Sequence, residues 1–214
     1  MKVKICGVKT EEVAIHVAKQ EADFIGLVFV ENVRRMISVD QGRKIVDSLK
    51  KSFNESPLVV GLFQNQSYLY IESVVKKSKL DLVQICGEND NFQGLSVPSI
   101  RQIRIMTDDS TQQIQDKVLS ALEIHSFVIL DSYDYKKPGG TGKVFDWRKI
   151  LDFNSYENIF IAGGLNSENV NSMISLVKPW GVDISSGVET KGEKDLQKIS
   201  NFINIVKDSE NFNS

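Results

Sequence analysis

The strongest constraint on the fold is an alternation of short apolar runs with longer amphipathic segments along the 214 residues. Eight runs rich in β-branched and aromatic residues have the length of buried strands. They are residues 3–6, 24–29, 58–63, 80–86, 100–106, 127–130, 159–162 and 182–184. Most intervening segments repeat apolar residues at helical spacing, as Ile71, Val74 and Val75 do. Because parallel strands need crossovers and are buried on both faces, this pattern predicts an α/β chain with a parallel sheet.

Eight strand and helix units average about 27 residues each, which suits a compact single (β/α)8 TIM barrel. A doubly wound sheet is the alternative, but it usually contains fewer strands. We expect the barrel to occupy residues 1–208, with its last helix over 194–207 and a frayed tail over 209–214. Residues that favour helix N-caps predict helix starts at Thr10, Ser38, Asp146 and Asn166.

Composition excludes several classes of protein. Hydrophobic residues make up 41% and charged residues 25%, which is typical of folded globular chains rather than disordered ones. The formal net charge of -2 provides no basic field for nucleic acid. No apolar run approaches the roughly 20 residues that cross a bilayer, and the first residues lack the apolar core of a signal peptide. We therefore expect a cytoplasmic protein with neither a nucleic acid nor a membrane as partner.

The ends of the predicted strands carry the candidate catalytic groups, because barrel active sites lie at the C-terminal ends of strands. Cys6 ends the first strand, where a thiolate has access to a ligand and can act as a base or nucleophile; simple packing is the alternative. Asp131 ends the sixth, where desolvation raises a carboxyl pKa and keeps an acid protonated; a loop cap is the alternative. Arg34 and Arg35 follow the second strand and offer a guanidinium to a carboxylate or phosphate. Two cysteines are too few for a disulfide framework, and two distant histidines lack the spacing of a structural zinc site, so we expect neither.

Glycine-rich turns follow the seventh and eighth strands. Gly163-Gly164 precedes a predicted helix, and Ser185-Ser186-Gly187 opens a short extra helix. Backbone N–H groups and positive helix ends at these two positions predict a phosphate site. Gly140, on the long loop after the sixth strand, adds a further backbone donor. The alternative is that these glycines serve only tight strand-to-helix turns.

Several motifs in this order and spacing resemble those of the phosphoribosylanthranilate isomerase family. They are Lys4-Ile5-Cys6-Gly7, the run 83–88, Leu130-Asp131, the run 139–147, Ala162-Gly163-Gly164-Leu165 with Asn169-Val170, the run 182–189, and Lys194-Asp195. The resemblance implies a (β/α)8 barrel of tryptophan biosynthesis that needs no cofactor. Its reaction is the Amadori rearrangement of N-(5-phosphoribosyl)anthranilate to 1-(2-carboxyphenylamino)-1-deoxyribulose 5-phosphate.

The same resemblance assigns roles to individual residues. It places the general base at Cys6 and the general acid at Asp131. It places the contact with the anthranilate group best at Arg35, since Arg35 and Ser38 match the family spacing, although Arg34 stays open. The other expected substrate contacts are Gly7, Gly140 and Asp183, and the expected phosphate contacts are Gly163, Gly164, Ser185, Ser186 and Gly187. Cys86 stands where histidine is common in the family, and we expect packing there rather than catalysis.

Three other functions are possible for a phosphate-binding barrel. The related imidazole-carboxamide isomerase of histidine synthesis would use two aspartates, but the first strand here ends in Cys6. A pentose-phosphate epimerase would need metal ligands that two distant histidines do not supply. A silent phosphate-binding barrel would need neither Cys6 nor Asp131. The expected partner is therefore a small phosphosugar substrate, and the chain is expected to be a monomer or a homodimer.

Overall fold

All eight predicted strands are present in the computed structural model, which describes residues 1–87, 94–132 and 145–211. The strands are β1 Lys2–Cys6, β2 Phe24–Val28, β3 Leu58–Phe63, β4 Leu82–Ile85, β5 Ser99–Ile105, β6 Phe127–Ser132, β7 Ile159–Ile161 and β8 Gly181–Ile184. Their hydrogen-bonding order follows the chain from β1 to β8 and is that of a closed barrel. This order confirms the (β/α)8 prediction over the doubly wound alternative.

Helices follow most of the strands. They are α1 Glu11–Lys19, α2 Val39–Ser52, α3 Tyr68–Ser78, α4 Thr111–Leu122, α5 Val170–Val177, α6 Leu196–Asn211 and the 3-10 helices η1 Trp147–Phe153 and η2 Ser186–Val188. A two-stranded hairpin, β9 Glu189–Thr190 with β10 Glu193–Lys194, precedes α6. The fold divides into two compact units, one of residues 4–101 and one of residues 1–3 with 102–214.

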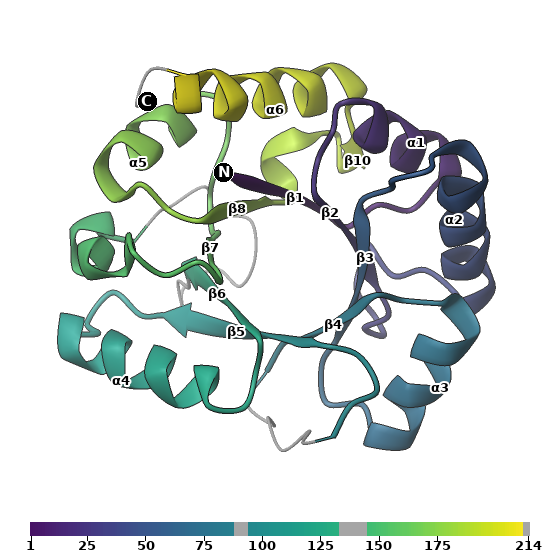
Figure 1. The fold of residues 1–214 in the computed structure, drawn as a ribbon, viewed down its shortest axis with the longest axis horizontal. Coiled ribbons are helices and arrows are strands. Elements are labelled where there is room, and N and C mark those ends of the chain that lie inside the picture. The colour runs from purple at the N-terminus through teal and green to yellow at the C-terminus, as the bar shows by residue number, and fades with distance from the viewer. Residues whose placement is uncertain (88–93, 133–144, 212–214) are drawn as a thin grey trace. The chain divides into compact units, whose positions relative to one another are not determined.

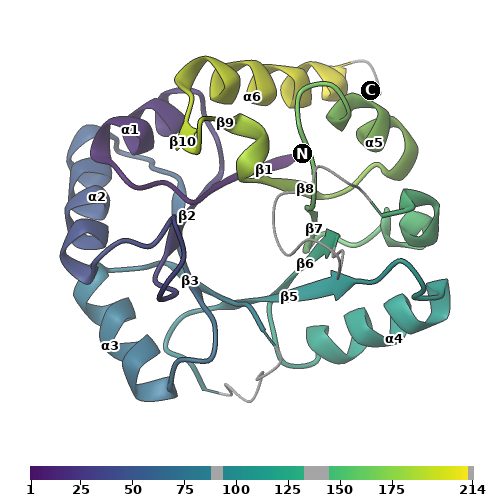
Figure 2. The ribbon, with the colours of Figure 1, turned by 180° about the vertical axis from the view of Figure 1, so that it is seen from behind.

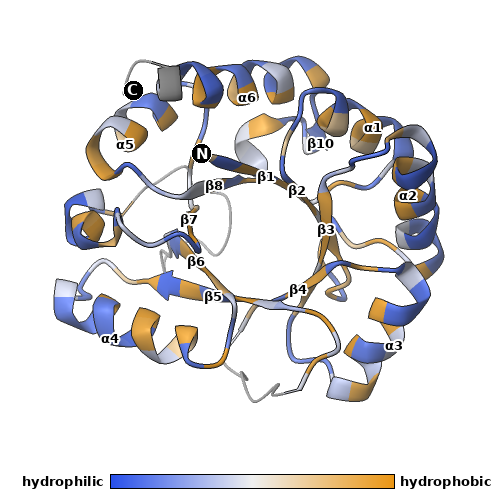
Figure 3. Cartoon of the chain, viewed as in Figure 1, coloured by the Kyte–Doolittle hydropathy of each residue, from blue (hydrophilic) through white to orange (hydrophobic). Residues whose placement is uncertain are grey.

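In the unit of residues 4–101, parallel strands β1 to β4 carry helices α1, α2 and α3 on their outer side (Figure 1). The strands are apolar along most of their length, whereas the helices turn polar residues outward (Figure 3). Two predicted N-caps are confirmed. Thr10 Oγ1 accepts from the Val13 N–H at 3.3 Å, and Ser38 forms a reciprocal capping box with Gln41.

In the unit of residues 1–3 and 102–214, strands β6, β7 and β8 pair in parallel, with Leu130 opposite Ile161 and Ile161 opposite Val182. Helices α4, α5 and α6 and the 3-10 helix η1 lie outside these strands (Figure 2). Trp180, just before β8, packs against Phe160 with ring centroids 4.9 Å apart. This aromatic contact packs the start of β8 against β7.

Two predicted helix starts differ in the structure. Helix α5 begins at Val170 rather than beside Asn166, because Asn166 Oδ1 accepts the N–H groups of Glu168 and Asn169 and forms a turn first. Asp146 caps the 3-10 helix η1 rather than an α-helix. In both places a side-chain cap forms as the residue type predicts, but the helix type or start differs.

The C-terminal boundary also differs from the prediction. Helix α6 continues to Asn211, three residues beyond the expected end of the ordered barrel at 208. Ser209 is buried, and its Oγ lies 2.6 Å from the Ile205 carbonyl oxygen and 3.1 Å from Asn171 Oδ1. Residues 209–211 are therefore helical rather than frayed, and the rest of the expected tail, residues 212–214, lies outside the described residues. Among the described helices, none combines the length and apolar character that a bilayer crossing requires.

Candidate active site

Cys6 is the last residue of β1 and is buried with a free thiol. The parallel register places it opposite Gly26 of β2. A Cβ atom built on Gly26 would lie 2.9 Å from Cys6 Sγ, so only glycine leaves room for the sulfur. The N–H groups of Gly7 and Val8 both donate to the Gly26 carbonyl, at 2.9 and 3.0 Å. The backbone on both sides of Cys6 is thus fixed against the neighbouring strand.

The two candidate arginines lie in the turn between β2 and α2. Arg34 is exposed, whereas Arg35 is half-buried. The turn is fixed directly after them, because Met36 forms a bridge with Val28 and the Ile37 N–H donates to the Val28 carbonyl at 2.9 Å. Arg35 thus directly precedes a fixed point of the turn, and its role as the anthranilate contact stays a prediction.

The Cys86 thiol follows β4 and contacts a core amide. Gln84 Nε2 lies 3.5 Å from Cys86 Sγ, and the Cys86 N–H donates to the Phe63 carbonyl at 2.8 Å. These contacts agree with the prediction of a packing role. Gln84 is itself buried, and within the described residues its Oε1 has no hydrogen-bond partner.

Asp131 lies near the end of β6 and is half-buried. Gln102 of β5 donates from Nε2 to Asp131 Oδ2 at 2.6 Å. On the other side lies Gly163, whose φ is +84° and on which a Cβ atom would lie 2.8 Å from Asp131 Oδ1. Gly163, which the sequence assigns to phosphate, therefore also makes room for the carboxyl group of the candidate acid.

Sequence reasoning missed Gln102. It stands in the run Ser99–Ile105, where polar and apolar residues alternate irregularly, and a strand-borne amide of this kind is usually a solvent-facing residue. The sequence does contain a signal for Gln102 in the order of the strands. Because neighbouring strands of a barrel point alternate residues the same way, a lone amide beside a strand that ends in aspartate is a candidate partner for it.

The two glycine-rich turns after β7 and β8 touch each other. A Cβ atom on Gly187 would overlap the Leu165 carbonyl oxygen, which places the two turns in direct contact. Asn169 Nδ2 donates to the Gly164 carbonyl at 2.9 Å and fixes the first turn. Within the described part of the chain, the N–H groups of Gly164 and Ser186 have no acceptor. The predicted phosphate donors therefore lie close together with at least two N–H groups available.

The hairpin β9–β10 joins the second turn to helix α6. Asp195 Oδ1 accepts the N–H groups of Gln197 and Lys198 at the start of α6, and its Oδ2 accepts the Thr190 hydroxyl at 2.7 Å. The hydrogen bond from Thr190, then those from the two N–H groups, lower the pKa of Asp195 below its ordinary value. An ionised Asp195 thus links Thr190 of β9 to the start of helix α6.

The remaining candidates are placed as follows. Asp183 lies within β8 and is buried, and Ser185 follows that strand. Gly140 lies outside the described residues. Within the residues that are described, no group of three or more His, Cys, Asp or Glu side chains is arranged to hold a metal ion.

The chain is similar to known isomerases over nearly its whole length. The family model described as N-(5'phosphoribosyl)anthranilate (PRA) isomerase matches residues 3–205. An N-(5'-phosphoribosyl)anthranilate isomerase of Leptospira interrogans is 40% identical over 96% of this chain and 94% of its own length. One of Dehalococcoides mccartyi is 35% identical over 98% and 97%.

Solved structures agree. The phosphoribosyl anthranilate isomerase of Thermotoga maritima superimposes with a TM-score of 0.83 at 31% identity, covering 97% of this chain and 99% of that one. A second isomerase structure, in complex with reduced 1-(o-carboxyphenylamino)-1-deoxyribulose 5-phosphate, has a TM-score of 0.79 at 28% identity over 97% and 99%. The match extends over nearly the whole length of both partners in each comparison. This chain therefore belongs to the N-(5'-phosphoribosyl)anthranilate isomerase family.

Proposed function

We propose that the chain isomerises N-(5-phosphoribosyl)anthranilate to 1-(2-carboxyphenylamino)-1-deoxyribulose 5-phosphate, with Cys6 as general base and Asp131 as general acid. One observation carries this proposal. The chain matches the family over residues 3–205, and it has a thiol at the end of β1 and a carboxyl group at the end of β6. The reaction is an aldose-to-ketose isomerisation within one molecule, so it consumes no electron donor and needs no cofactor.

The first step opens the sugar ring. Asp131 donates its proton to the ring oxygen while the bond between that oxygen and C1 breaks, and the nitrogen lone pair forms a C1=N double bond. Gln102 accompanies this transfer, because its N–H group donates to Asp131 Oδ2 and stabilises the carboxylate that the step leaves behind.

The second step removes the proton from C2. The Cys6 thiolate takes it, the electrons of the C2–H bond form a C1=C2 double bond, and the iminium nitrogen becomes an amine again. The resulting enol becomes the ketone when C1 takes a proton back from the Cys6 thiol and the C2 hydroxyl releases its proton, which restores the acid form of Asp131. A positioned acid or base contributes roughly 10²- to 10⁴-fold in rate, so the two residues together account for a large part of catalysis.

Substrate binding involves the remaining candidate residues. Arg35, half-buried after β2, binds the anthranilate carboxylate as a planar donor pair. The turns containing Gly163, Gly164 and residues 185–187 bind the phosphate through backbone N–H groups, and Asp183, Gly7 and Gly140 complete the contacts. Substituting each arginine in turn tests the alternative that Arg34 binds the carboxylate. Competition between inorganic phosphate and the substrate tests the alternative that the glycines serve only to form turns.

Two isosteric substitutions test the catalytic assignment. Cys6→Ser keeps the size of the side chain but has no accessible anion near neutral pH, and Asp131→Asn keeps the shape but has no carboxylic proton. Each variant is expected to lose at least about a hundredfold in kcat, with folding and substrate binding nearly intact. The measurement is the decrease of anthranilate-type fluorescence under steady-state conditions, with circular dichroism as the folding control.

The outcome that contradicts the assignment is a folded variant that isomerises the substrate within a few-fold of the parent rate. A packing role predicts the reverse pattern, in which thermal stability falls and the rate per folded molecule is kept. We also infer that the enzyme works in the cytoplasm on a small phosphosugar. Both a monomer and a homodimer remain compatible with the proposal, although one solved relative from Thermotoga maritima is described as dimeric.

A further inference from the structure

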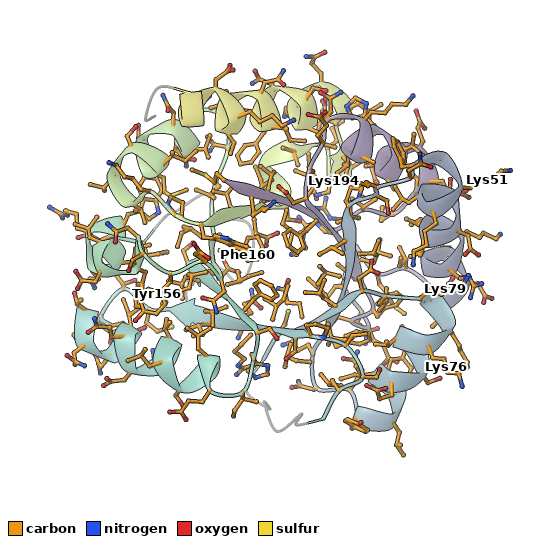
Figure 4. All side chains as sticks on the ribbon, in the orientation of Figure 1. Lys51, Lys76, Lys79, Tyr156, Phe160 and Lys194 are labelled. Carbon is orange, nitrogen blue, oxygen red and sulfur yellow. The ribbon has the colours of Figure 1, made fainter. Side chains whose placement is uncertain are left out.

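A buried ion pair lies directly behind the turn after β8. The Lys194 ammonium of β10 lies 2.9 Å from Glu189 Oε1, and the two side chains are only 3% and 6% exposed. These residues are cross-strand partners in the hairpin, with Lys194 opposite Glu189. Lys194 lies among packed side chains in Figure 4, whereas Lys51 and Lys76 extend outward from their helices. No step of the proposed mechanism uses this pair.

The ammonium has two further acceptors, both in the turn. Lys194 Nζ donates to the Ser185 carbonyl oxygen at 2.8 Å and lies 3.4 Å from Ser185 Oγ. An ammonium has three N–H donors, so it can donate to Glu189 Oε1 and to both Ser185 oxygens together. Lys198 Nζ donates to the Glu189 carbonyl at 2.9 Å and holds the hairpin from the side of α6.

The bond to the Ser185 carbonyl has a consequence for the next N–H group. In a planar trans peptide, the C=O of one residue and the N–H of the following residue point in opposite directions. Fixing the Ser185 carbonyl toward Lys194 therefore fixes the Ser186 N–H to point away from it. That N–H has no acceptor among the described residues, and a cation on the carbonyl also polarises the peptide and strengthens the N–H as a donor.

We propose that Lys194, neutralised by Glu189, is a positioning residue that orients the Ser185–Ser186 peptide for the substrate phosphate. This inference rests on the phosphate role of the turn in the proposed function. The charge of Lys194 does not attract the phosphate directly, because Glu189 compensates it at 2.9 Å and both groups are buried. The pair acts instead through the direction of one peptide N–H.

The decisive variant replaces both members of the pair. Lys194→Met alone leaves a buried carboxylate without its cation, which strongly destabilises a protein, whereas replacing both members with apolar residues of similar volume is often tolerated. In the double variant Lys194→Met with Glu189→Leu, we expect KM to rise at least tenfold. The inhibition constant of inorganic phosphate should rise by a similar factor, while kcat stays within about threefold.

Lys117→Met is the matched control. It also removes an ammonium from an ion pair with a buried carboxylate, at 2.8 Å from Asp109, but it does not contact the phosphate turn. It should lower thermal stability and leave both KM and phosphate inhibition unchanged. Lys194→Arg, which keeps a cation and N–H donors near the Ser185 carbonyl, should recover part of the affinity that the double variant loses.

The results separate this inference from the proposed function. If the parent isomerises its substrate and phosphate competes with it, but the folded double variant keeps both constants within twofold, the pair is only a structural link and the inference is wrong. If phosphate does not compete with substrate in the parent, the phosphate role of the turn fails first, before any variant is made. If the KM of the double variant rises no more than the KM of Lys117→Met, the inference is also wrong.

Discussion

A methyl group added at Gly26 is expected to disable Cys6 without touching any reacting atom of the substrate. Gly26 lies opposite Cys6 in the register of β1 and β2, and its backbone has no positive φ that alanine would strain. The new Cβ atom would lie 2.9 Å from Cys6 Sγ, 3.1 Å from Cys6 Cα and 3.2 Å from Leu62 Cδ1. Of these three contacts, the sulfur is the shortest and is at the end of a side chain, so it is the atom that moves.

The size of the effect follows from these distances. Non-bonded heavy atoms pack at about 3.5–4.0 Å, so the sulfur and the methyl group must separate by roughly 0.6–1.1 Å beyond 2.9 Å. A misplacement of about 1 Å at a reacting group costs about 10²-fold in rate. We therefore expect Gly26→Ala to lower kcat by about 10- to 100-fold. Overpacking of the barrel should cost about 1–3 kcal/mol of stability in addition.

Gly61→Ala provides the matched control for this experiment. Gly61 lies in β3 of the same unit, and a Cβ atom there would lie 2.9 Å from Phe63 Cε2 and overlap Leu80, but it would not contact Cys6. Both variants should therefore lose stability by similar amounts in thermal melts. Steady-state kinetics, normalised to folded protein, should show the large loss of kcat in Gly26→Ala alone. An equal loss of kcat in the two variants would refute the reasoning, because general overpacking would then explain it.

Two further outcomes follow from other parts of the molecule. Arg35→Ala should raise KM or lower kcat more than Arg34→Ala, since Arg35 is half-buried and Arg34 exposed, and the opposite order in steady-state kinetics would assign the role to Arg34. Desolvation raises the pKa of Asp109, but hydrogen bonds from Lys117 and the Met106 N–H outweigh it, so the pKa lies below its ordinary value. The stability that Asp109 contributes is thus present above the unfolded pKa of about 3.9 and lost as the pH falls through the lower folded value. The stability difference between the parent and Asp109→Asn should therefore shrink in thermal melts as the pH falls below the unfolded pKa of about 3.9, and a constant difference would contradict this assignment.

The order of strands and most of their bounds could be predicted because buried parallel strands are short, continuous and apolar. The range 58–63 agrees with β3 to the residue, and the others differ by one or two residues at an end. Helix starts were less predictable. Asn166 has the residue type of an N-cap, but its side chain accepts two N–H groups in a preceding turn, and residue type alone does not distinguish these arrangements.

The C-terminal end shows the same limit. The Asn- and Ser-rich composition after 208 favours fraying, but Ser209 is held by Asn171, which is 38 residues earlier in the chain. No local pattern reports such a contact. The same reason explains why Gln102 and Lys194 were not identified as functional candidates. Each matters through a partner that is distant along the chain or across a turn, namely Asp131 and Ser185.

The two proposed catalytic side chains share an arrangement that a sequence can reveal once the strand order is known. Cys6 at the end of β1 lies against Gly26 of β2, and Asp131 of β6 lies against Gly163 directly after β7. In each case a Cβ atom on the glycine would lie within 2.9 Å of the functional atom. Gly26 is directly opposite Cys6, whereas Gly163 is one position beyond the residue opposite Asp131, because Leu130 pairs with Ile161. In a parallel barrel, residues at matching heights on adjacent strands point to the same side, so a functional side chain there needs a small neighbour. A glycine at the end of the following strand, opposite the reactive residue or one position beyond, is therefore a sequence signal for a catalytic position.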